Sequence, residues 1–450
     1  MIEEKCTFGD NNENCNCILH SNTHKDKDNF KLFNLALEKA LEEENKYGDI
    51  QLKEIYFSKM YNLEKMHNIF DKYKDKEIFF SNCRFQKLNY NNLSENKKEL
   101  KNIRFYNCKF DEINFQGIIF DKQILKYDNS NEFYKINLLK LKNCQVKSEF
   151  IFKSYNQNRK FKIDNVDISH SIFDKSFVFE DIQNCSKFNM DYTEFNSVVD
   201  FTKTHFDEIS LKATIFQKLV LFNEVLFKGS LNLSSTIFKD EVNFLGIKNK
   251  NGKNLETDNI KNRETARIIK HSFEKLDNII EANKFYALEM QKREEELSKE
   301  KNWSDLIVFK FHKISSNHSQ DWLLALLWMI NLTFVYTAFQ FVEVVDSHWL
   351  YLYSFLSIGL IITSIEGLAC LEIPKDYKGL FCIIFIFLNW ISYSLITDDY
   401  TMCYASNNFN PFSIMTGKES LSFGTLIYKA IIAFLIYQFI ISIRQNTRRK

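Results

Sequence analysis

The sequence predicts a β-solenoid, a right-handed quadrilateral parallel β-helix, followed by a helical hairpin or coiled-coil connector and a four-helix transmembrane domain. Three observations predict this fold: apolar side chains at every fifth position in the first half, an apolar seam over 262–301, and four long apolar segments from Trp322 onward. A period of five belongs neither to a helix, which repeats near 3.6 residues, nor to a strand, which repeats at 2. It fits a chain that runs straight, turns and repeats, so that four sides close one coil of about 20 residues.

The five-residue repeat predicts a β-helix over 78–247, of about eight coils. On each side the residues at i−2 and i point inward, and the residue between them points outward. The stretch Asn129–Asn158 is out of phase and is expected to hold inserted loops. The expected core residues are Ile103, Phe105, Cys108, Phe110, Ile113, Phe115, Ile118 and Phe120, and in a second run Phe201, Phe206, Leu211 and Phe216.

These residues resemble the pentapeptide-repeat family, and the resemblance implies a right-handed quadrilateral β-helix. Several positions carry Ile or Val where the family prefers Ala, so wider or irregular coils are expected there. The chain as a whole resembles bacterial pentapeptide-repeat membrane proteins with channel-like C-termini. Solenoid surfaces serve many unrelated functions, so the resemblance implies a fold and not an activity.

Composition limits the partners and the compartment. With 59 basic and 58 acidic residues the net charge is +1, so no polyanionic partner and no nucleic acid is expected. Met1–Asp10 is acidic and lacks an apolar core, so no cleavable secretion signal is expected. Of the ten cysteines, Cys370, Cys382 and Cys403 lie in or beside the apolar segments. The others are interpreted as reduced thiols of a cytoplasmic domain, with Cys83 and Cys108 at inward positions that need a small apolar side chain.

The polar N-terminus, residues 1–29, contains a group of potential metal ligands. The spacing of Cys15 and Cys17 is too tight for the common zinc knuckle, and no second pair follows. An unliganded cap is favoured over metal binding, and no cofactor is expected. The group comprises Cys6, Cys15, Cys17, His20 and His24.

Two further segments flank the predicted β-helix. Residues 30–77 are expected to form a helical N-terminal cap, in which Phe33, Leu37 and Leu41 cover the open end of the solenoid. Residues 248–261 are polar and are expected to be a linker.

Residues 262–301 carry an apolar seam that begins at Ala266, Ile269 and Phe273. One interpretation is a continuous coiled coil. The other, which we favour, is a hairpin broken at Asp277–Asn278, because Asp-Asn is turn chemistry and the stretch resembles a tetratricopeptide-like helix pair.

After a juxtamembrane segment, 302–321, a transmembrane domain is expected over 322–443, followed by a basic tail, 444–450. Its four apolar segments are near the roughly 20 residues needed to span a bilayer, and the third is the shortest. The segments are Trp322–Val345, Trp349–Leu371, Leu380–Ile396 and Phe423–Ile443. Basic residues gather on one side, so the positive-inside rule places both termini and the β-helix in the cytoplasm, at a bacterial inner membrane.

No catalytic motif occurs in the sequence, and an enzyme is not expected. The first functional hypothesis is a non-enzymatic membrane protein whose β-helix is a protein-binding or assembly surface, with a homo-oligomer as one option. The alternative is an ion channel or small-solute pore, gated by the repeat domain and built from the third helix, the loop Thr397–Ser422 and the fourth helix. That loop lacks a filter sequence, so a simply folded external loop is favoured.

The candidate functional residues within and beside the membrane segments are Glu366, Lys429, Gln438, Asp398 and Asp399. Ionised groups in a bilayer are costly and usually have partners. We expect the fourth segment to pack against the second and third, so that Glu366 contacts Gln438 and Lys429 contacts Asp398 or Asp399. The alternatives are that Lys429 reaches only the lipid headgroups and that Glu366 is neutral and has no such partner.

Overall fold

The structure is a computed structural model that describes residues 18–20, 29–59, 72–73, 75–92, 98–100, 103–127, 134–154, 161–183, 185–300, 303–345, 349–412 and 422–447. The chain divides into two compact units, Met1–Leu276 and Asp277–Lys450. Cys6, Cys15, Cys17, His24 and the basic tail residues 448–450 lie outside the described residues.

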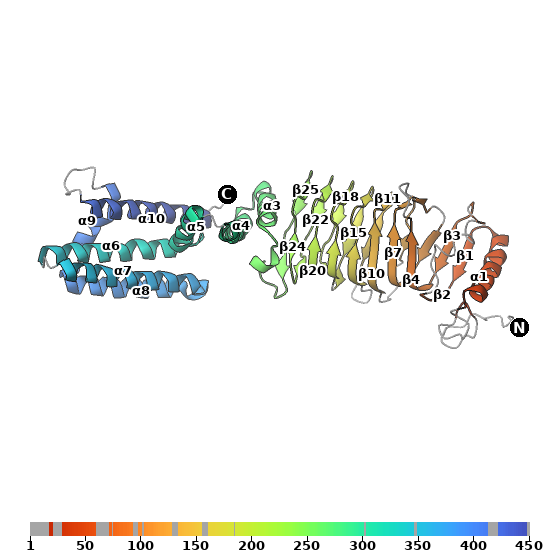
Figure 1. Cartoon of the computed structure of the whole chain (residues 1–450), viewed down its shortest axis with the longest axis horizontal. Helices are drawn as coiled ribbons and strands as arrows, with labels where there is room; N and C mark the ends of the chain where they lie inside the picture. The colour runs from red at the N-terminus through yellow and green to blue at the C-terminus, as the bar shows by residue number, and fades with distance from the viewer. Residues whose placement is uncertain are drawn as a thin grey trace. The chain divides into compact units, whose positions relative to one another are not determined.

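The first unit is a parallel β-helix whose strands stack between α1 and α3 (Figure 1). The first sheet contains β1 (Ile50–Lys53), β3 (Ile78–Ser81), β6 (Ile103–Tyr106) and β9 (Leu125–Lys126). The second contains β2 (Tyr56–Phe57), β4 (Arg84–Asn91), β7 (Lys109–Gln116), β10 (Tyr134–Lys142), β13 (Phe161–Asp167), β16 (Ile182–Gln183), β17 (Cys185–Asn189), β20 (His205–Ser210), β23 (Leu226–Phe227), β24 (Leu231–Asn232) and β27 (Lys248–Asn249). The third contains β5 (Lys98–Glu99), β8 (Ile118–Phe120), β11 (Gln145–Val146), β14 (Ile172–Phe173), β18 (Glu194–Phe195), β21 (Ile215–Phe216) and β25 (Ile237–Phe238). The fourth contains β12 (Phe150–Lys153), β15 (Phe177–Glu180), β19 (Val199–Asp200), β22 (Val220–Leu221) and β26 (Val242–Asn243).

The second sheet wraps around a corner, which makes the coil four-sided. In β7 the buried positions change phase between Phe110 and Ile113, so one long strand covers two sides. The seven strands of the third sheet mark seven coils in the described part of the chain, against the eight expected. The predicted β-helix is confirmed. Residues 134–154 are part of it, because β10 and β11 pair with the coils on either side and β12 pairs with β15. The loops expected in Asn129–Asn158 would fall at 129–133 and 155–158, outside the described residues.

The coils are longer than the predicted 20 residues. Phe177 pairs with Val199, and Val199 pairs with Val220, so these two coils take 22 and 21 residues. The extra length comes from sides of six residues beside corners in the left-handed backbone region. Such corner residues include Tyr192 and Lys203, at φ 58° and 59°, neither of which is a residue type that signals a turn.

A small hydrogen-bond donor follows each of eight left-handed corner residues. The Oγ1 of Thr204 donates to the carbonyl of Phe179 at 2.6 Å, and that of Thr214 to the carbonyl of Met190 at 2.8 Å, each in the preceding coil. The thiol of Cys108 donates to Phe80 O at 3.2 Å, and burial raises the pKa of this thiol. At these eight positions the buried side chain therefore acts as a hydrogen-bond donor. Three other left-handed residues, Glu54, Asp181 and Glu224, are followed by an apolar side chain instead. The eight donors are Cys83, Cys108, Cys144, Ser171, Thr193, Thr204, Thr214 and Thr236.

Replacing Thr214 with valine should lower the free energy of unfolding by about 1–3 kcal/mol, because the buried carbonyl of Met190 loses its donor. Thr214→Ser keeps the hydroxyl and should recover the hydrogen bond. Hydrogen–deuterium exchange of the full-length chain in denaturant, read on peptides from β20 and β21, measures both. Equal protection in the valine and serine variants would show that the hydroxyl contributes nothing.

Stacked rings fill the interior. All twelve expected core residues are at most 7% exposed. The Phe195 and Phe216 rings stack at 5.1 Å, and Phe216 stacks on Phe238 at 5.0 Å in the next coil. Because each ring meets its equivalent one coil away, the repeat buries a continuous core.

Both ends of the β-helix are covered. At the N-terminal end, α1 (Phe30–Glu44) continues into η2 (Asn45–Tyr47), and its Phe33 ring meets Phe57 edge-on at 5.5 Å. At the other end η3 (Thr257–Asn259) precedes α3 (Arg263–Lys275), and Thr265 Oγ1 accepts from the backbone N–H of Leu233 at 2.9 Å. The expected linker 248–261 thus contains β27 and η3 and belongs to this end of the β-helix.

The helical connector is broken, so the interpretation as one continuous coiled coil is wrong. The first helix, α3, ends at Lys275, and α4 (Ile279–Glu300) follows. Asp277 adopts φ 56°, and Asn278 Oδ1 accepts from the backbone N–H of Glu281 at 3.3 Å. The break falls at the predicted Asp-Asn pair.

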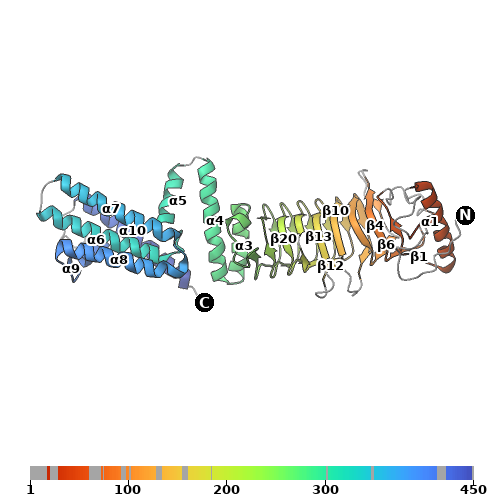
Figure 2. The same cartoon turned by 90° about the horizontal axis from the view of Figure 1, so that it is seen from below.

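The second unit contains four helices long and apolar enough to cross a membrane, which run side by side (Figure 2). Half of the α6 span is buried, more than in the other three. The third span is as long as the others, contrary to expectation. The helices after α4 are α5 (Trp303–Ser316), α6 (Trp322–Val345), α7 (Trp349–Glu372), α8 (Lys375–Thr397), α9 (Cys403–Phe409) and α10 (Phe423–Thr447).

The first span, α6, is the helix against which α7, α8 and α10 all pack. The prediction that the fourth segment packs against the second and third is therefore wrong. Gly367 explains the closeness of α6 and α7, since a Cβ there would lie 2.2 Å from the Trp328 ring. Apolar clusters join α6 to α8 through Phe334 and Tyr393, and to α10 through Met329 and Ile432.

Candidate functional site

The Glu366 carboxyl lies at the junction of α6, α7 and α8. Its Oε2 accepts from Asn331 Nδ2 at 2.8 Å and from Asn389 Nδ2 at 2.6 Å. Glu366 is 9% exposed and Asn331 only 1%, and Asn331 Oδ1 has no hydrogen-bond partner among the described residues. Two amide donors on one carboxyl oxygen lower the cost of placing this group in a bilayer.

Gln438 does not meet Glu366, so that predicted contact is wrong. Its Oε1 accepts from Ser316 Oγ at 2.9 Å and from Ser319 Oγ at 3.2 Å. Ser316 is the last residue of α5, and Ser319 lies in the α5–α6 connection. Gln438 lies in the C-terminal half of α10, which therefore contacts this connection.

Lys429 donates to the carbonyl oxygens of Asn408 and Asn410, both at 2.9 Å, where we expected Asp398 or Asp399. The Lys429 contact was therefore predicted with the wrong partner. Instead, α9 folds over the end of α6, and Asn408 Nδ2 donates to Gln340 Oε1 at 2.7 Å. The described part of the loop Thr397–Ser422 thus contains a short helix, α9, that packs on α6.

The two aspartates have local roles at the end of α8. Asp398 is the left-handed C-cap of the helix, at φ 54°. Asp399 Oδ2 accepts from Tyr393 Oη at 2.6 Å, and its two oxygens accept the backbone N–H groups of Cys403 and Tyr404. Burial alone would raise the pKa of Asp399, but these hydrogen bonds lower it.

A histidine pair at the α5–α6 connection was missed by the sequence interpretation. His312 Nδ1 and His318 Nδ1 are 3.2 Å apart, and Ser319 Oγ lies 3.2 Å from His312 Nε2. Asn317, His318 and Ser319 are consecutive left-handed residues, at φ 48°, 56° and 63°. Three such residues in a row are strained, and the only sequence signal is the polar run between two helical segments.

Burial, with a smaller contribution from His312, lowers the pKa of His318 to about 4. The folded state therefore favours the neutral imidazole. The unfolded pKa is near 6.5, so this stabilisation is complete above pH 6.5 and is lost as the pH falls toward 4. Lys313 acts in the same direction, and Glu294 opposes it.

Acidification from pH 7.5 to 5 should increase hydrogen exchange, corrected for intrinsic rates, at the α5–α6 connection. His318→Asn should reduce this pH dependence, since asparagine tolerates the left-handed backbone and does not titrate. His271→Asn, at an exposed site on α3, is the control. A pH response unchanged by His318→Asn would contradict the assignment.

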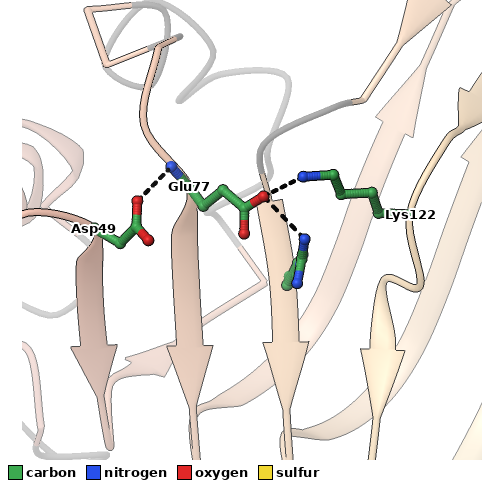
Figure 3. Close-up of polar contacts among 4 residues, drawn as sticks. Asp49, Glu77 and Lys122 are labelled. Atoms are coloured by element: carbon green, nitrogen blue, oxygen red, sulfur yellow. Dashed lines mark hydrogen bonds and ion pairs between the residues drawn. The ribbon is translucent and has the colours of Figure 1, made fainter.

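A cluster of charges on the first sheet connects four coils of the β-helix. Glu77 Oε1 accepts from Arg104 at 2.9 Å and from Lys122, and its backbone N–H donates to Asp49 Oδ1 at 3.4 Å (Figure 3). The hydrogen bond from Lys122, aided by Arg104, holds the pKa of Glu77 below its usual value. Arg104 also lies over the Phe79 ring, 5.4 Å from its centre. The cluster is a structural link between coils.

A groove of about 590 Å³ lies at the C-terminal end of the β-helix, between the last coil and α3. Ile237, half exposed, and Leu276 contribute apolar surface to it. Charges of both signs surround them, from Asp240, Glu241, Arg267, Lys270, Glu274 and Lys275. Within the described residues no group of three potential metal ligands occurs.

Fold and site together define a multi-pass membrane protein that carries a β-helix domain. Comparison of the chain with protein families, with curated proteins and with solved structures finds no match.

Proposed function

We propose that the chain is a non-enzymatic protein of a bacterial inner membrane that presents a pentapeptide-repeat β-helix in the cytoplasm as a protein-binding or assembly surface. The observation that carries this proposal is the groove beside α3. Its lining combines exposed apolar side chains with charges of both signs, as protein interfaces do, whereas the coil interior is filled by side chains. A partner would insert an apolar side chain against Ile237.

The variant Ile237→Glu tests this proposal because it replaces an exposed apolar side chain of the groove with a charged one. Leu35→Glu is the matched control, since Leu35 on α1 is equally exposed and lies at the other end of the β-helix. We expect a partner that co-purifies with the full-length wild type to be lost at least tenfold with Ile237→Glu and retained with Leu35→Glu. Equal recovery with both variants would remove the groove from consideration.

The proposed orientation rests on charge. Lys310, Lys313 and Arg444 lie at one end of the spans, while Asp398 and Asp399 lie at the other. We expect an impermeant maleimide to label Cys403, the exposed first residue of α9, in intact cells whose outer membrane is permeabilised. Labelling of Cys6 without Cys403 would reverse the orientation.

A second candidate function, an ion channel or small-solute pore, is favoured by the buried polar junction of Glu366, Asn331 and Asn389. This junction belongs to α6, α7 and α8, so it replaces the third-helix, loop and fourth-helix arrangement as the candidate pathway. Unitary currents of the full-length protein in planar bilayers, altered by Glu366→Gln and unaffected by Glu372→Gln on the exposed part of α7, would support it. The absence of unitary currents would contradict the channel function and leave the binding surface as the proposed function.

A further inference from the structure

A second groove, of about 680 Å³, lies between α4, α5 and α10. Its walls are almost entirely apolar. They include Tyr286 and Met290 on α4, Val308 and Phe311 on α5, and Ile431 and Phe434 on α10. The remaining polar lining residue, His312, already has His318 and Ser319 at its two ring nitrogens. The groove therefore offers little to a ligand that needs hydrogen bonds.

The α10 wall of the groove is part of a membrane span. Ile427 to Phe434 lie inside the span Phe423–Gln445, so this wall faces hydrocarbon when the span is in a bilayer. A groove along such a wall is open to acyl chains from the side.

The opposite wall, α5, has the character of an interfacial helix. Its 14 residues are too few to cross a bilayer. Nevertheless, Trp303, Val308 and Phe311 are 64–70% exposed, and Ile307 beside them is 52% exposed. Apolar residues exposed this way on a short helix that leads into a membrane span are stable in the bilayer interface. Lys310, also exposed, can reach the phosphate level from there.

We propose that the groove between α4, α5 and α10 binds one acyl chain of a membrane phospholipid, with its phosphate near Lys310. A second copy of the chain would be a less suitable occupant, because stable protein interfaces contain about one hydrogen bond per 100–200 Å² and these walls provide almost none. An acyl chain needs no hydrogen bond, and it is the chemistry present at the depth of Ile427 to Phe434.

The test fills the groove from either wall in the full-length chain. On α10, Ala430 lines the groove, whereas Ala433 is exposed but does not line it. On α5, Val308 lines the groove, whereas its exposed neighbour Ile307 does not. Ala430→Trp and Val308→Trp are therefore the test variants, and Ala433→Trp and Ile307→Trp their matched controls. Bound palmitoyl-oleoyl phosphatidylglycerol and phosphatidylcholine are counted per chain by native mass spectrometry after detergent exchange, with thermal melting as the check on folding.

We expect both test variants to lose one phospholipid per chain, while wild type and both controls retain it. If both lipids were lost to the same extent, the groove would recognise the acyl chain alone. A stronger loss of phosphatidylglycerol would indicate that Lys310 also contacts the headgroup. Unchanged lipid counts in folded Ala430→Trp and Val308→Trp would overturn the proposal. Loss of chain–chain association without loss of lipid would overturn it too, in favour of a second copy.

Discussion

Replacing Phe110 with alanine should lower the free energy of unfolding of the β-helix by about 3–5 kcal/mol, because the surrounding coils cannot collapse into the cavity. The Phe110 ring is 2% exposed. It stacks on Phe85 at 5.3 Å and meets Phe105 edge-on at 5.5 Å, so its loss removes contacts in its own coil and in the preceding one. Hydrogen–deuterium exchange of the full-length chain in denaturant, read on peptides from β4, β7 and β8, measures the change.

Lys109 provides the matched control, since it precedes Phe110 and its side chain points outward. Lys109→Ala should change the free energy of unfolding by no more than about 0.5 kcal/mol. Equal destabilisation by the two variants would contradict the inward and outward alternation on which the repeat was predicted.

The β-helix was predictable because its contacts recur at a nearly constant sequence separation. Each core ring packs on its equivalent one coil away, so a period in the sequence is also a contact in space. The coil length was less predictable. Tyr192, Lys203 and Ala213 adopt the left-handed conformation at corners, although none of them is a glycine or asparagine, the residue types that predict this conformation. The donors at Thr204 and Thr214 follow from those corners, and a search for small apolar residues missed their hydroxyl role.

The membrane spans were predictable from hydropathy, whereas their packing was not. In a bilayer both the lipid-facing and the buried sides of a helix are apolar, so periodicity does not reveal which helix is central. Polar residues indicate which helices are neighbours only when both partners of a contact are known. Glu366 was recognised as costly, but its partners, Asn331 and Asn389, lie on two helices whose neighbours the sequence does not specify.

Breaking the Asp321–Lys378 ion pair should strongly destabilise the second unit. Asp321 Oδ2 accepts from Lys378 Nζ at 2.6 Å, and the two side chains are 12% and 8% exposed. The pair connects the start of α6 to the first turn of α8, and Asp321 Oδ1 also caps α6 by accepting from Leu324 N. Removing one partner leaves a buried charge without its counter-ion, which typically costs about 3–5 kcal/mol.

A double-mutant cycle separates the pair from its parts. Lys378→Met and Asp321→Asn should each destabilise the bundle by that amount, and the double variant should recover most of the loss, because no uncompensated charge remains. Lys284→Met is the control, since Lys284 and Glu281 form a pair of the same 2.6 Å length whose side chains are 40% and 33% exposed. The destabilisation caused by Lys284→Met should stay within about 1 kcal/mol. Dodecyl sulfate titration of the full-length chain in mild-detergent micelles, followed by circular dichroism of the helices, measures the stability of all four variants. If the loss of stability in the double variant equalled the sum of the two single losses, the two charges would not stabilise each other.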